Sequence, residues 1–118
     1  MSNDSIAAQI GQAWRYQREG KTDAAIAEFD RILRQDADNV DAHYGMGLAQ
    51  RAAGKYETAI KHFERALALV EAGTAARHQG HVGEILVANT PEDDRLMMLN
   101  RMIKQRLAET NNAMKPRA

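Results

Sequence analysis

The strongest constraint on the fold of this chain is an internal repeat with a period of 34 residues. When residues 40–73 are aligned with residues 6–39 without a gap, nine positions carry the same amino acid. The identical pairs are Ala8/Ala42, Gly11/Gly45, Gly20/Gly54, Lys21/Lys55, Ala25/Ala59, Ile26/Ile60, Phe29/Phe63, Arg31/Arg65 and Leu33/Leu67. A period of this length is typical of proteins in which one small unit stacks on copies of itself. Because such a unit cannot bury its apolar face alone, the two copies are expected to pack together.

Residue choice and spacing indicate that each copy is built from helices. The chain has 21 alanines and only two prolines, which favours helix over sheet. Apolar residues recur three and four positions apart, as in the series Ile60, Phe63, Leu67 and Val70. The turn signals that divide the chain into six segments are Gly20, Asp38-Asn39, Gly54, Gly73-Thr74 and Asn89-Thr90. The pattern therefore predicts six amphipathic helices, each of which needs a packing partner.

Two stretches resemble the second half of the tetratricopeptide repeat. They are Gly20-Lys-Thr-Asp-Ala-Ala25-Ile-Ala-Glu-Phe29 and Gly54-Lys-Tyr-Glu-Thr-Ala59-Ile-Lys-His-Phe63-Glu-Arg-Ala66-Leu67. In that family, a small alanine lets the two helices of a unit approach, and the aromatic residue four positions later fills the gap between units. The resemblance assigns these roles to Ala25 with Phe29 and to Ala59 with Phe63.

The resemblance implies an all-α fold, a right-handed stack of antiparallel helix-turn-helix hairpins. We expect two clear repeats at residues 6–39 and 40–73 and a divergent capping hairpin at 74–109, all within a single domain over 1–109. The third unit is divergent because its small and aromatic positions fall on Asp93 and Met97. Residues 110–118 have no apolar pattern and are expected to form a flexible tail.

Composition narrows the possible functions. The chain has 16 Lys+Arg against 16 Asp+Glu and no cysteine. The balanced charge argues against bulk binding of nucleic acid or of an acidic membrane. The absence of thiols excludes disulfides, thiolate metal sites and a cysteine nucleophile. No apolar run approaches the ~18 residues that a membrane span needs, and no targeting signal is apparent. We therefore expect a cytoplasmic protein that binds neither nucleic acid nor membrane.

Catalytic and metal-binding motifs are sparse. The only serines are Ser2 and Ser5, and the sequence contains no glycine-rich phosphate loop. His78, His81 and Glu84 are spaced to share one helical face and could in principle ligate a metal. A solvated or hydrogen-bonding role explains the same residues, and no second helix offers an obvious fourth ligand. The sequence thus predicts a protein that is not an enzyme and holds neither cofactor nor metal.

In a tetratricopeptide stack the first helix of each hairpin lines a concave groove, so the resemblance implies a set of groove residues. These are Ile10, Gly11, Trp14, Gln17, Arg18, Tyr44, Gly45, Leu48, Arg51, His78 and Val82. They do not include the set of Lys, Asn and Arg with which some members hold a peptide's C-terminal carboxylate, so that mode is rejected. An apolar, aromatic groove suits a hydrophobic or amphipathic segment of a protein partner.

Two alternatives to groove binding remain open. In the first, the last helix of the chain itself covers the groove. The helical glycines Gly11 and Gly45 do not decide this question, because the space beside them can accommodate either a ligand or a neighbouring helix. The last helix carries apolar residues on more than one stripe, so it can also pair with a second chain. Such self-association would make the protein a structural scaffold or homodimer. Its candidate residues are Leu96, Met98, Met102 and Ile103.

Overall fold

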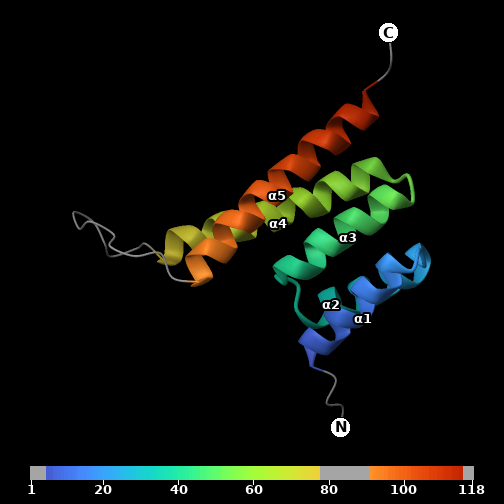
Figure 1. Ribbon diagram of the computed structural model, residues 1–118, viewed down its shortest axis with the longest axis horizontal. Coiled ribbons are helices and arrows are strands. Elements are labelled where there is room, and N and C mark those ends of the chain that lie inside the picture. The colour runs from blue at the N-terminus through green and yellow to red at the C-terminus, as the bar shows by residue number, and fades with distance from the viewer. Residues whose placement is uncertain (1–4, 78–90, 116–118) are drawn as a thin grey trace, which may run out of the picture.

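The structure, a computed structural model, describes residues 5–77 and 91–115. Within these ranges it contains five helices and no strand (Figure 1). The helices are α1 (Ile6–Arg18), α2 (Thr22–Gln35), α3 (Val40–Ala52), α4 (Tyr56–Arg77) and α5 (Pro91–Met114). The pairs α1/α2 and α3/α4 form antiparallel hairpins, α3 packs on α2, and α5 lies along α4. This arrangement confirms the predicted all-α stack of helix-turn-helix hairpins.

Short polar and glycine residues set the limits of the hairpins. The side chains of Ser5 and Asn39 accept hydrogen bonds from the backbone N–H groups of Ala8 and Ala42, which caps α1 and α3. Each hairpin turns at a glycine with a positive φ angle, 76° at Gly20 and 82° at Gly54. A side chain would strain this left-handed conformation, so the two identical glycines of the repeat have the same structural role.

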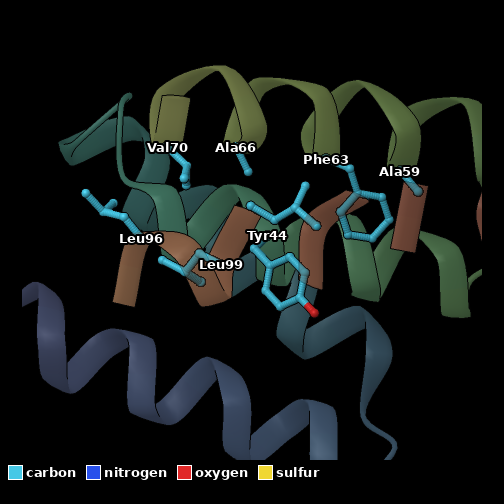
Figure 2. Close-up of a cluster of buried hydrophobic side chains, with 8 residues drawn as sticks. Tyr44, Ala59, Phe63, Ala66, Val70, Leu96 and Leu99 are labelled. Atoms are coloured by element: carbon cyan, nitrogen blue, oxygen red, sulfur yellow. The ribbon is translucent and has the colours of Figure 1, made fainter. Parts of the chain in front are cut away.

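Two clusters of buried residues form the core. The first cluster joins α1, α2 and α3 through Ala13, Ala25, Phe29, Ile32, Ala42, Met46 and Ala49. The second cluster joins α3, α4 and α5 through Tyr44, Ala59, Phe63, Ala66, Val70, Leu96, Leu99 and Ile103 (Figure 2). Both predicted alanine–phenylalanine pairs are fully buried in these clusters.

The glycines inside α3 make room for the two buried phenylalanines. A Cβ atom at Gly45 would overlap the ring of Phe29, and one at Gly47 would overlap the ring of Phe63. In contrast, Gly11 on α1 is exposed, and a Cβ atom there would meet nothing within 4 Å. The close approach at Gly45 is therefore made by the chain's own α2.

Two predicted helix ends differ from the structure. α4 continues through Gly73 and Thr74, where the sequence predicted a break. The Thr74 hydroxyl donates to the carbonyl oxygen of Val70 at 3.1 Å within the same helix. α5 continues past Glu109 to Met114, because Thr110 is fully buried and its hydroxyl donates to the carbonyl oxygen of Arg106 at 2.7 Å. The expected tail over 110–118 is thus helical as far as Met114.

The predicted fifth helix falls largely on residues 78–90, which lie outside the described residues. The first helix of the capping hairpin expected at 74–109 therefore stays a prediction. None of the helices in the described part of the chain combines the length and apolar character needed to cross a membrane.

Candidate functional site

Three helices, α1, α3 and α5, run in the same direction across the molecule (Figure 1). Each contributes apolar side chains that are only partly buried, among them Trp14, Leu48 and Met102. All three pack against the second core cluster. We call this set the three-helix face. It combines two predicted groove residues with Met102, which the sequence pattern assigned to self-association.

Tyr44 lies beneath this face rather than on it. Its ring centroid is 6.2 Å from that of Trp14 and 5.9 Å from that of Phe63, and the residue is 6% exposed. Figure 2 shows the ring among side chains from α4 and α5. The prediction that Tyr44 is open to a partner is therefore wrong, because α5 docks beside it. Gly45 is also buried, and the ring of Phe29 occupies the space beside it.

A charged network links α3 to α5 at the edge of the three-helix face. Arg51 and Arg106 both point a guanidinium nitrogen at the same oxygen of Glu109, at 3.4 Å and 2.7 Å. Gln105 donates to the other carboxylate oxygen at 3.3 Å. The hydrogen bond from Arg106 is the main cause that lowers the pKa of Glu109, so this carboxylate stays ionised. Two cations thus share one anion, which leaves an excess of positive charge.

Arg106 also binds the buried tyrosine. A hydrogen bond with Tyr44, followed by the bond to Glu109, raises the pKa of Arg106. Sequence reasoning missed Arg106 and Glu109 as part of this site. Arg106 and Glu109 are three residues apart, and Met102 and Arg106 are four apart, so all three lie near one another on α5. Only the docking of α5 brings them close to Arg51.

The remaining predicted groove residues of α1 have different environments. Ile10 is partly buried against the first core cluster, and Gly11 is exposed. Gln17 is partly buried, and no group in the described part of the chain donates to its shielded Oε1 atom. Arg18 is exposed and forms no ion pair with the described residues. Of these residues, Arg18 is therefore best placed to meet a charged partner. His78 and Val82 lie outside the described residues.

The candidate self-association residues divide into two groups. Leu96 is 7% exposed and Ile103 is fully buried, so both hold α5 on α4 and offer little or no surface to a second chain. That part of the prediction is wrong because these side chains form the apolar face on which α5 docks. Met98 is 55% exposed and Met102 is partly exposed, so both remain accessible. Met97, on the same turn, is 54% exposed.

No group of three histidine, cysteine, aspartate or glutamate residues in the described ranges is arranged to hold a metal ion. The predicted candidates His78, His81 and Glu84 fall outside those ranges.

Comparison with known proteins identifies the repeat. A family model described as tetratricopeptide repeat matches residues 10–76, which include most of the first copy of the 34-residue pattern and all of the second. No curated protein matches the chain.

Proposed function

Because this chain belongs to the tetratricopeptide repeat family, whose repeats generally mediate protein–protein interactions, we propose that it binds an amphipathic helix of a protein partner on the three-helix face. The observation that carries this proposal is the placement of Trp14, Leu48 and Met102. Three different helices each leave at least one apolar side chain partly exposed against the same core cluster. The helices of a stack are held by their neighbours, so such a face is rigid before the partner arrives.

The charges beside the face specify the partner further. Each helix carries an arginine about one turn after its apolar residue: Arg18 follows Trp14, Arg51 follows Leu48, and Arg106 follows Met102. Since the three helices run in the same direction, the arginines lie toward the same end of the face (Figure 1). Glu109 is the carboxylate that pairs with two of them. The complementary partner is a helix with an apolar stripe and acidic residues beyond one end of it.

This function does not require catalysis. The apolar residues supply affinity by leaving water, and the arginines select orientation and partner charge. Aromatic residues are often among those that contribute most to an interface, which points to Trp14. We accordingly assign the chain a non-catalytic role as an interaction module.

The first test introduces a negative charge into the three-helix face at Leu48. We expect Leu48→Glu to weaken partner binding by about 30-fold or more, because a carboxylate replaces an apolar contact and repels the acidic side of the partner. Native lysate is passed over the immobilised wild-type chain, and copurifying proteins are identified by mass spectrometry. The dissociation constant is then measured with the purified partner for both chains.

The matched control is Leu69→Glu, which makes the same chemical change at a partly buried residue of α4, outside the three-helix face. It is expected to bind like the wild type. Circular dichroism checks that both variants are helical. A fully folded Leu48→Glu chain that binds the partner as tightly as the wild type removes the proposal. Arg18→Glu then tests the charge assignment, since it should weaken binding to an acidic partner helix.

Self-association through α5 is a second candidate function, favoured by the exposure of Met97 and Met98 on one turn. A hollow of about 370 Å³ lies beside Met97, and it is lined by Thr74, Leu96, Met97, Asn100, Arg101 and Lys104. If a second chain packs here, the molecular mass in analytical ultracentrifugation rises with concentration. Met97→Glu is then expected to return the protein to monomer. A monomer mass for the wild type at every concentration excludes this function.

A further inference from the structure

Two histidines join α3 to α4 away from the three-helix face. The Nδ1 atoms of His43 and His62 are 3.2 Å apart, with the ring centroids separated by 5.4 Å. The Nε2 atom of His43 lies 2.8 Å from the carbonyl oxygen of Ala37. Because a carbonyl oxygen only accepts, Nε2 of His43 carries a proton. In the neutral ring Nδ1 of His43 then has a free lone pair, which accepts the Nδ1–H of His62.

We propose that His43 and His62 bind one divalent transition metal ion, such as Zn²⁺, through their Nδ1 atoms. Zinc–imidazole bonds are about 2.0–2.1 Å long, so two such ligands on a tetrahedral ion lie roughly 3.3–3.4 Å apart. The two nitrogens are already separated by 3.2 Å, so the ion can enter between them with a small adjustment of the side chains. The metal replaces the shared proton: His62 loses the proton on Nδ1 and takes one up on Nε2, and its ring stays neutral.

The surroundings of the pair match those of a metal site. Histidines that bind metals usually donate their second ring N–H to a carbonyl or carboxylate, which fixes the orientation of the ring. His43 makes this contact with the Ala37 carbonyl. Burial lowers the pKa of His62, which keeps the ring in the neutral form that binds metals, whereas the Asp30 carboxylate acts in the opposite direction and favours a nearby positive charge.

Water completes the coordination of the proposed ion. No third side chain of the described residues is arranged to join the two histidines as a ligand, and both rings are partly exposed to solvent. Two imidazoles select Zn²⁺ or Cu²⁺ over Mg²⁺, which prefers oxygen ligands. The bound ion cross-links α3 and α4 and, through Ala37, secures the turn between the two hairpins. The site does not depend on the proposed partner binding.

The test uses the 118-residue chain as a background in which the other two of the four histidines are replaced, His78→Gln with His81→Gln. Isothermal titration with Zn²⁺ is expected to give one ion per chain. At a free Zn²⁺ concentration of about ten times the dissociation constant, the melting temperature should rise by about 5 °C. Mg²⁺ at the same concentration should leave the melting temperature unchanged.

Adding His62→Gln to this background is expected to abolish both the stoichiometric binding and the rise in melting temperature. Circular dichroism checks that this variant is folded, and His43→Gln provides a second variant that removes the other ligand. Two results overturn the proposal. One is the absence of Zn²⁺ binding by the background chain up to about 1 mM, and the other is undiminished binding by a folded chain lacking either His43 or His62.

Discussion

Gly47→Ala is expected to lower the free energy of unfolding by about 1–3 kcal/mol, although alanine is the better helix former by about 1 kcal/mol. The added Cβ atom would overlap the ring of Phe63. That ring is fully buried in the second core cluster, among side chains of α3, α4 and α5. The overlap must therefore push α3 away from α4. Urea unfolding monitored by circular dichroism measures the effect.

The same substitution at Gly11 provides the control. Gly11 also lies inside a helix, but it is exposed and a Cβ atom there meets nothing within 4 Å. Gly11→Ala is thus expected to raise the free energy of unfolding by up to about 1 kcal/mol. In a Phe63→Leu background, the cost of Gly47→Ala should shrink because the smaller side chain makes room. A Gly47→Ala chain as stable as the wild type would show that the Phe63 ring is not confined as described.

Ile103→Glu is expected to detach α5 and to cost about 3–5 kcal/mol of stability. Ile103 is fully buried between α5 and α4, so a carboxylate placed there loses its hydration without gaining a partner. Far-ultraviolet circular dichroism should show loss of helix, and limited proteolysis should cut within α5. Because α5 covers Tyr44, the same change is expected to expose the tyrosine ring.

Met98→Glu is the matched control on the same helix. Met98 is 55% exposed, so its replacement should change the free energy of unfolding by no more than about 0.5 kcal/mol. The comparison separates the docked face of α5 from its open face. Equal effects of the two substitutions would contradict the assignment of Ile103 to the core.

The repeat could be predicted from the sequence because its key residues are local and occur twice. The family resemblance carried by Ala25 with Phe29, and by Ala59 with Phe63, implied that all four pack between helices, and each is fully buried. Gly20 and Gly54 were equally informative, since a positive φ angle is a property of the local backbone. The identical glycines Gly11 and Gly45 have different surroundings: the ring of Phe29 fills the space beside Gly45, whereas Gly11 is exposed.

The position of α5 could not be derived from the same pattern. Tyr44 occupies an expected groove position, yet it is buried because α5 docks beside it. Arg51 pairs with Glu109, which lies 58 residues away in the sequence, so no local spacing could reveal the contact. The break expected at Gly73 also depended on context. The helix continues there, with Leu96 of α5 beside Gly73.

The aromatic rings that link the two hairpins include a single tryptophan. Trp14 stacks edge-on against Phe29 at 5.5 Å and lies 6.2 Å from Tyr44, so it touches both core clusters while remaining partly open to water. Its fluorescence is therefore an intrinsic probe that needs no label. Separation of the hairpins should shift the emission to longer wavelength, whereas a helix that covers Trp14 should shift it to shorter wavelength. One optical signal thus distinguishes unfolding from occupancy of the face by the direction of its shift.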